Sequence, residues 1–315
     1  MKNSIIQRAE VWASSLWESS RIRWTVRSVQ DRNYRSHVIH PALASLFDRL
    51  YPEGHIHVLD LGCGDGIFIE DNVGRKVLAE GGSYTGVDIS ADFIARDQPL
   101  IDSGMVSFIQ GNLTDPGFPG ELFSHGLKWN CVLSVFTIQE IPDLEMFMGN
   151  LKRIVTSGSP AIIITVHPEF AEWLRENGRL RLEENLEIPP EQGKADPPAI
   201  PCPPVKPGDN RGTGGRMPLW RWAGQYPIVD EPRKAFYLPY FHRIIHDYRL
   251  GFTQAGFCIE QVIELPEKNS DLPRLVREGI SPFVPFETNL YWPRIAEVCS
   301  SVVFVIRKES KGEQR

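Results

Sequence analysis

Glycines and carboxylates gather at one point of the chain, in the run Asp60-Leu-Gly-Cys-Gly-Asp-Gly66. The glycines at 62, 64 and 66 have no Cβ, so their backbone can take positive φ and approach a bound molecule closely. The apolar residues from His57 predict a strand before them. The residues from Ile67 can begin a helix, whose first N–H groups are free to bind a ligand. This strand, turn and helix predict a nucleotide-type site at the carboxyl end of a parallel strand.

The glycine spacing distinguishes two kinds of nucleotide site. A dinucleotide fingerprint reads G-x-G-x-x-G, whereas here the third glycine comes one residue earlier and position 67 is Ile. The run resembles motif I of class I S-adenosylmethionine (SAM)-dependent methyltransferases, in which the glycine loop surrounds the methionine part of SAM. The alternative is a tight turn in another α/β domain. The resemblance implies that the cofactor is bound by Asp60, Gly62, Cys63, Gly64 and Gly66.

A second acidic strand end supports the same resemblance. The short apolar run that begins at Ser83 ends in Asp88-Ile89. An acid at this place can accept hydrogen bonds from the ribose hydroxyls of an adenosine. Asp88 and Ile89 are therefore predicted to bind the cofactor. The alternative is an aspartate that only caps the next helix.

The third and fourth predicted strands supply the remaining cofactor candidates. The third ends near Asn112 and Leu113, where the Asn112 side-chain carbonyl and the Leu113 backbone would meet the adenine edge. The family often has Asp at this turn, so Asn112 is a mild departure and Asp115 is an alternative. Ser134 lies within the fourth strand and is the last cofactor residue predicted.

Three side chains are candidate acids or bases for the methyl acceptor. Glu140 follows the fourth strand, at a place that borders donor and acceptor in the family. His167 ends the fifth strand, and a neutral imidazole can take up a proton near pH 7. His242 lies in Phe241-His242-Arg243, which resembles a tyrosine-histidine-arginine run of small-molecule methyltransferases. The alternatives are a helix cap for Glu140 and a structural role for His167.

Contacts with the acceptor are predicted from two regions outside the nucleotide core. Apolar residues at helical spacing occur near the N-terminus, and such helices lie across the SAM site in many small-molecule methyltransferases. A later stretch rich in Pro and Gly leads into a dense aromatic cluster, which we interpret as a cap around a planar or apolar acceptor. The alternatives are a helical packing arm and a satellite core. The substrate-binding candidates are Tyr34, His37, Trp220, Trp222, Tyr237 and Tyr240.

The order of the elements predicts a doubly wound α/β fold. We expect a seven-stranded, mostly parallel sheet with an antiparallel last strand, together with N-terminal helices and an inserted cap. The predicted parts are an N-terminal helical lid at 1–50, a Rossmann-like SAM-binding core at 51–168, a Pro-rich and aromatic cap at 169–240, and a C-terminal completion of the sheet at 241–315.

Composition restricts the partners. The 315 residues carry a net charge of −6, which argues against a large nucleic-acid surface. The chain contains no apolar run of about 18 residues that would predict a membrane span, and its first residues lack the apolar core of a signal peptide. The five cysteines are scattered without a C-x-x-C pair, so the sequence predicts no metal site and a cytoplasmic setting.

The sequence therefore predicts a SAM-dependent methyltransferase that acts on an O, N or C atom of a small-molecule acceptor without a metal ion and leaves S-adenosylhomocysteine. The donor supplies the reactivity, so the protein has to position the acceptor, exclude water and remove a proton. We expect a monomer or homodimer. The alternatives are a protein or peptide methyltransferase, and a SAM-binding protein that uses the cofactor structurally or in another reaction.

Overall fold

The computed structural model describes residues 2–24, 35–94, 104–176, 180–183, 220–229, 235–266 and 299–308. Its elements, in chain order, are α1 (Lys2–Trp24), η1 (Arg35–Ile39), α3 (His40–Leu50), β1 (His57–Leu61), α4 (Ile67–Glu70), α5 (Asn72–Ala79), β2 (Ser83–Asp88), α6 (Ala91–Ile94), β3 (Val106–Gln110), α8 (Phe118–Ser124), β4 (Cys131–Val135), η2 (Ile138–Glu140), α9 (Leu144–Ile154), β5 (Pro160–Val166), α10 (Pro168–Glu176), β6 (Arg181–Leu182), β7 (Trp222–Val229), β8 (Ala235–His242), α11 (Ile245–Gln254), β9 (Phe257–Leu265) and β10 (Ser301–Lys308).

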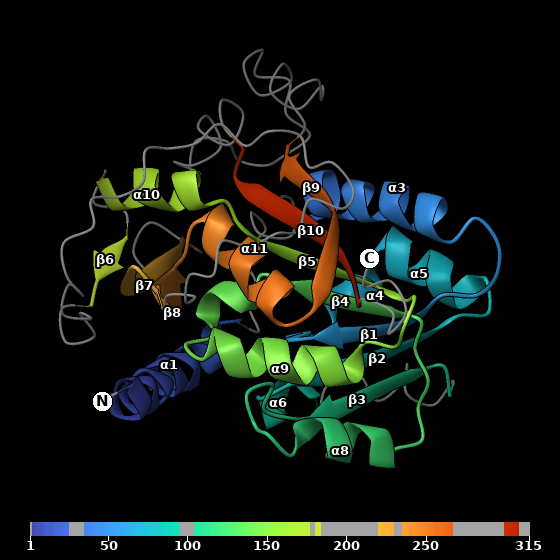
Figure 1. The fold of residues 1–315 in the computed structure, drawn as a ribbon, viewed down its shortest axis with the longest axis horizontal. Helices are drawn as coiled ribbons and strands as arrows, with labels where there is room; N and C mark the ends of the chain where they lie inside the picture. Colours follow the sequence, from blue (N-terminus) through green and yellow to red (C-terminus); the bar gives the residue numbers. More distant parts are fainter. Residues whose placement is uncertain are drawn as a thin grey trace.

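Seven strands form the central sheet, in the order β3-β2-β1-β4-β5-β10-β9 (Figure 1). The first five strands in this order are parallel to one another. The last strand of the chain, β10, is antiparallel to both β5 and β9. The predicted fold class is thus confirmed.

Both faces of this sheet are apolar, because helices cover both. Val58 and Leu133 point to the side covered by α3, α4 and α5. Leu59 and Val132 point to the opposite side, covered by α8, α9 and α11. Burial on both faces explains why the strands read as continuous apolar runs rather than alternating ones.

The strand order reverses between β1 and β4. From β1 the chain moves outward through β2 to β3, and then returns to place β4 on the other side of β1. In open α/β sheets the crevice at such a reversal, outside the carboxyl ends of the strands, is where ligands bind. The fold therefore places the glycine turn after β1 at this point.

A second, three-stranded sheet of β6, β7 and β8 is inserted between β5 and α11. It lies beside the central sheet, between α1 and α10 (Figure 1). Phe241 packs on Ala9 and Ala13, so α1 covers this small sheet. The predicted boundary at residue 240 falls inside β8. The Pro-rich part of the predicted cap lies outside the described residues.

Two predicted helices are less regular than their sequences indicate. The helix after the glycine turn is broken at Asp71, which is extended with φ −87° and ψ 165°. The Asp71 carboxylate lies 2.7 Å from Nδ1 of His40, so tertiary pairing accompanies this break. The second N-terminal helix begins with the π turn η1. Within the described residues, no helix combines the length and apolar character needed to cross a bilayer.

Candidate functional site

The glycine turn is bound to the end of β2. The N–H groups of Gly62 and Cys63 both donate to the carbonyl of Val87, at 2.8 and 3.0 Å. Gly62 has φ +78°, and a Cβ there would lie 2.3 Å from Cγ2 of Thr137. Any side chain at this position would be strained and would clash. The turn can therefore pass close to the end of β4 only with glycine at 62.

Asp88 lies directly beside this turn. Its Oδ2 accepts from the Gly64 N–H and its Oδ1 from the Ser90 N–H, both at 2.9 Å. Burial raises the pKa of the Asp88 carboxyl, and the donors at Ser90 and Gly64 lower it. Each oxygen keeps a second lone pair. The carboxylate is thus fixed in place while it can still accept two further hydrogen bonds, as the diol of a ribose requires.

Asp60 is a buried acid at the end of β1. Its Oδ2 accepts from the Tyr84 hydroxyl at 2.9 Å. Its Oδ1 is buried and has no hydrogen-bond partner among the described residues. Burial raises the pKa of Asp60 to about 7, while Tyr84 and Arg35 lower it. A buried carboxylate oxygen of this kind needs a donor. An ammonium group, such as that of SAM, fits this place.

Cys63, Ser134 and Ile89 are the other predicted cofactor residues near the turn, and their side chains differ in the contacts that they can make. Burial raises the pKa of the Cys63 thiol well above its usual range, so the thiol stays protonated. Ser134 is fully buried, and its hydroxyl donates to the Leu61 carbonyl at 3.0 Å. This contact fixes β4 to β1. Ile89 is 51% exposed beside Asp88, where a planar base could cover it.

The loop after β3 is held in place partly by hydrogen bonds between its own residues. Both Thr114 N and Thr114 Oγ1 donate to Oδ1 of Asn112, at 3.0 and 2.9 Å. The side-chain carbonyl of Asn112 therefore already accepts two hydrogen bonds, which weakens the predicted contact between this side chain and adenine. Buried Asn150 donates to the carbonyls of Leu113 and Asp115, at 2.9 and 2.7 Å. Sequence reasoning missed Asn150, although a polar residue within the apolar stripe of a helix was a usable signal.

Arg35, from the N-terminal part of the chain, places a positive charge at the ends of β1 and β4. Arg35 is 8% exposed, and its Cζ lies 5.1 Å from the ring centroid of Phe136. Glu140 follows on η2. Its pKa is raised well above the usual range by burial and by Asp88, and Arg35 acts in the opposite direction. Arg35, Asp60 and Glu140 thus share one electrostatic environment at the ends of β1 and β4.

His167 has structural contacts through both ring nitrogens. Its Nδ1 accepts from the Glu169 N–H at 3.3 Å, at the start of α10. Its Nε2 lies 3.6 Å from Oε1 of Glu264. The side chain is 3% exposed. These contacts favour the structural alternative for His167, and its role as an acid or base remains a prediction.

His242 ends β8, and this strand packs against η2. Its Nε2 lies 3.5 Å from Oε1 of Glu172 on α10, and the residue is 1% exposed. Burial lowers the pKa of His242 to about 4, although Glu172 raises it. The imidazole is therefore neutral near pH 7. With Nε2 facing a carboxylate, Nδ1 is the nitrogen that can accept a proton.

The residue after His242 connects the small sheet to the central one. Arg243 is fully buried, and its Nη2 donates to the carbonyls of Ile141 and Pro142, both at 3.0 Å. Asp247 accepts from the Ile244 N–H at 2.9 Å and also pairs with Arg221. These contacts hold the end of β8 against the segment that carries Glu140. The sequence run suggested only His242 as a functional residue.

The predicted substrate residues fall into three groups. Tyr34 lies outside the described residues, and so do the side chains of His37, Trp222 and Tyr237. Trp220 is buried against Phe241, with ring centroids 5.0 Å apart, on the α1 side of the small sheet. Tyr240 faces the opposite way, toward α10, with its ring centroid 6.0 Å from that of His242. Acceptor binding by these residues stays a prediction.

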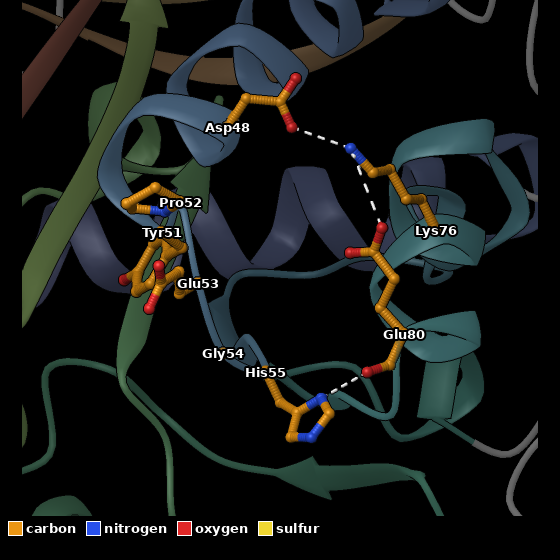
Figure 2. A pocket seen from close by; sticks show the side chains of 8 residues that line it. All are labelled: Asp48, Tyr51, Pro52, Glu53, Gly54, His55, Lys76 and Glu80. Atoms are coloured by element: carbon orange, nitrogen blue, oxygen red, sulfur yellow. Dashed lines mark hydrogen bonds and ion pairs between the residues drawn. The ribbon is translucent and has the colours of Figure 1, made fainter.

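A hollow of about 510 Å³ opens at the other edge of the sheet, between the ends of α3 and α5 (Figure 2). Nζ of Lys76 lies 2.8 Å from Oδ1 of Asp48 and 4.0 Å from Oε1 of Glu80 across it. Residues 51–55 form its floor and lead into the amino end of β1. It therefore lies away from the glycine turn. The described residues contain no group of three His, Cys, Asp or Glu side chains that could hold a metal ion.

Comparison of the chain with known proteins agrees with this geometry. A family profile described as a methyltransferase domain matches residues 32–192. An uncharacterized methyltransferase of Mycobacterium bovis is 26% identical over 121 residues, which are 38% of this chain and 56% of that protein. An uncharacterized methyltransferase of Mycobacterium tuberculosis matches to the same extent. The chain thus spans little more than half the length of these relatives.

Two solved structures share the fold. One is the PH0226 protein of Pyrococcus horikoshii, with a TM-score of 0.53 and 16% identity over 93% of this chain and 99% of that one. The other is a complex between the Trm112 methyltransferase activator of Haloferax volcanii and a methyltransferase, with a TM-score of 0.51 and 14% identity over 93% and 96%. At these identities the likeness concerns the fold alone.

The fold and the turn after β1 define a class I methyltransferase, with SAM as its cofactor. The profile match covers more than half of the chain, and the chain belongs to the methyltransferase-domain family. The predicted family is therefore confirmed. The roles of the individual residues remain proposals.

Proposed function

We propose that the protein transfers a methyl group from SAM to a small-molecule acceptor at the carboxyl edge of β1, β4 and β5. One observation carries the choice of a small acceptor: the polar side chains beyond β4 and β5 are buried beneath β8 and α10. Gln139 is 3% exposed, and His242 is 1% exposed. A folded macromolecule could not reach such groups, whereas a small molecule can be enclosed with them. The small sheet and α1 would then act as the cap.

SAM supplies an activated methyl group when it is bound. In this proposal the Asp88 carboxylate binds the ribose hydroxyls, and Asp60 accepts from the ammonium group. The glycine turn allows the backbone to approach the methionine part. Ile89 would cover one face of the adenine. These assignments use the free lone pairs of Asp88 and the buried Oδ1 of Asp60.

His242 is proposed to take the proton that the acceptor loses. A base with a pKa of about 4 is too weak to ionise a hydroxyl before transfer. For a hydroxyl acceptor it is strong enough once the oxygen has been methylated, because a protonated ether is a far stronger acid than an imidazolium ion. His242 therefore fits a step in which proton removal follows methyl transfer or accompanies it.

The net charge of −6 further supports an acceptor that is not a nucleic acid. The scattered cysteines support a cytoplasmic setting.

The test is to incubate the protein with methyl-labelled SAM and a cell extract, and then to separate the products by size. The proposal expects label in the low-mass fraction. It also expects Asp88→Ala to weaken SAM binding more than tenfold by calorimetry. Glu121→Ala, which changes an exposed acid on α8, should leave both results unchanged. Label in protein would replace the small acceptor by a peptide, and SAM binding without any label would reject methyl transfer.

The role of His242 needs a separate variant. His242→Asn should reduce turnover about 100-fold or more and leave SAM affinity unchanged. His246→Asn, which changes an exposed histidine four residues further along the chain in α11, is the matched control. Equal turnover of the His242 variant and the wild type would remove His242 from the reaction.

A further inference from the structure

Helix α10 is fixed to the central sheet at its first turn. The His167 carbonyl accepts from the Ala171 N–H at 3.0 Å, and the His167 N–H donates to the Ser300 carbonyl at 2.8 Å. One side of the helix is buried in the core through Phe170, Ala171 and Leu174. These contacts prevent the helix from rotating, so the side chains on its other faces have defined positions.

Glu172 lies on α10 and has a different partner at each carboxylate oxygen. Its Oε2 accepts from Nε of Arg175, three residues further along the helix, at 2.5 Å. Its Oε1 lies 3.5 Å from Nε2 of His242. The Glu172 side chain is 34% exposed, whereas that of His242 is 1% exposed. Because water reaches Glu172, this carboxylate does not need the imidazole to satisfy its own hydrogen-bonding capacity.

The strand fixes the backbone of His242 but not the orientation of its ring. The His242 carbonyl accepts from the Arg221 N–H at 2.8 Å, and the Tyr240 ring lies 6.0 Å from the imidazole, centroid to centroid. Neither contact distinguishes the two ring nitrogens or the two neutral tautomers. The Glu172 carboxylate does distinguish them, because it accepts a hydrogen bond from an N–H and repels a lone pair.

The contact between Glu172 and His242 is not a salt bridge at neutral pH. Burial lowers the pKa of His242 to about 4, so the ring is uncharged. Of the charged groups around it, Glu172 and Asp247 raise this pKa, and Arg221 and Arg175 lower it. A carboxylate beside a neutral imidazole orients the N–H, and it stabilises the positive charge once the ring takes up a proton.

We propose that Glu172 is a positioning residue that holds His242 in its Nε2–H tautomer, so that Nδ1 carries the lone pair which takes the proton of the acceptor. This inference rests on the proposed function. The acceptor proton moves to Nδ1, and Nε2 keeps its own hydrogen. Glu172 balances the charge of the resulting imidazolium, which returns the Nδ1 proton to water when the product leaves. A third group that orients a base in this way recurs in proton-transfer sites.

Nitrogen-15 NMR of the histidine-labelled protein near pH 7 measures the tautomer without any acceptor. His242→Asn identifies the His242 signals among those of the eight histidines. The wild type should carry the hydrogen on Nε2. Glu172→Gln should reverse this tautomer, because Arg175 donates to the oxygen on its side and leaves the amide NH₂ facing His242. Glu172→Met should remove the preference.

The effect on the reaction is measured with methyl-labelled SAM and a cell extract, as label in the low-mass fraction. Glu172→Gln should lower the initial rate at least tenfold, because Nδ1 then carries the hydrogen. Its affinity for SAM should stay unchanged by calorimetry. Glu169→Gln, which changes an exposed glutamate on the same helix, is the matched control and should behave as the wild type in all three measurements.

The possible outcomes separate the claims. An unchanged tautomer in both Glu172 variants would overturn the positioning role, and so would a reversed tautomer with an unchanged rate. A lower rate with an equal loss of SAM affinity would mean that Glu172 supports the fold around the cofactor, which also overturns the proposal. Absence of low-mass label with the wild type would instead reject the proposed function, on which the NMR measurement does not depend. Circular dichroism of each variant checks that the protein remains folded.

Discussion

Asp60 should make SAM binding depend on pH. Burial raises its pKa to about 7, so the side chain is mostly protonated in mildly acidic solution. Only the carboxylate form can pair with the ammonium group of SAM. Binding must therefore release a proton below the pKa of Asp60, and affinity must rise with pH. The perturbation that isolates this effect is Asp60→Asn, which keeps the size of the side chain and an acceptor for the Tyr84 hydroxyl.

The magnitude follows from the fraction of Asp60 that is ionised. The apparent Kd is multiplied by about 33 at roughly pH 5.5 and by about 2 at roughly pH 7, for a group with a pKa of about 7. Affinity should thus rise about sixteenfold over this range, which is about 1.6 kcal/mol. The range stays below roughly pH 7.5, where an α-amino group begins to lose its own charge.

Calorimetry in two buffers with different ionisation heats measures the effect directly. At about pH 6 the wild type should release close to one proton per SAM bound, and near pH 7.5 it should release few. Asp60→Asn should bind more weakly near pH 7, and the Asp60 part of the pH dependence should be absent. The unliganded protein offers a second check. Because the folded pKa of Asp60 lies above its unfolded value, the stability of the wild type relative to Asp60→Asn should fall as pH rises from about 4 to about 7.

The pH dependence of SAM affinity in the wild type, compared with that in Asp60→Asn, tests whether Asp60 binds the ammonium group. Asp88 and Glu140 also have raised pKa values, so some pH dependence should persist in Asp60→Asn. If the variant and the wild type gain affinity by the same factor and release the same number of protons, Asp60 does not meet the ammonium group. The assignment of its buried Oδ1 would then be wrong.

Two further predictions concern the supports of the site. Gly62→Ala should lower the thermal midpoint and abolish SAM binding, because its Cβ would lie 2.3 Å from Thr137; Gly54→Ala, also at positive φ but with nothing within 4 Å, should cost only about 1–2 kcal/mol by denaturant titration. Arg243→Met should destabilise by roughly 1–3 kcal/mol, because it leaves the buried carbonyls of Ile141 and Pro142 without their donor. Wild-type stability in this variant would mean that these carbonyls find other donors.

The sequence predicted the central sheet well for a physical reason. Strands buried on both faces need continuous apolar runs, and their carboxyl ends are marked by Asp60, Asp88 and the glycines between them. These signals are local, so they can be read without knowing the fold. The cofactor side of the site was predictable for the same reason.

The acceptor side was less predictable, because its contacts join distant segments. Strand β7 pairs with Arg181 and Leu182 across the Pro-rich stretch, which no local pattern indicates. Trp220 and Tyr240 have similar chemistry in the sequence, yet they lie on opposite sides of the small sheet. The role of Arg243 depends on carbonyls about a hundred positions earlier. Such roles follow from the tertiary structure and not from residue type.

The packing of α1 on β8 affects how the chain folds. Ala9 and Ala13 cover Phe241, so the residues between them must be made before this contact can form. At roughly 5–20 residues per second, synthesis leaves the apolar side of α1 without its partner for roughly 10–45 seconds. Closing so long a loop is also slow compared with pairing neighbouring strands. Strands β1 to β5 can associate during this interval. The part of the protein that holds the cofactor can therefore fold before the part that encloses the acceptor.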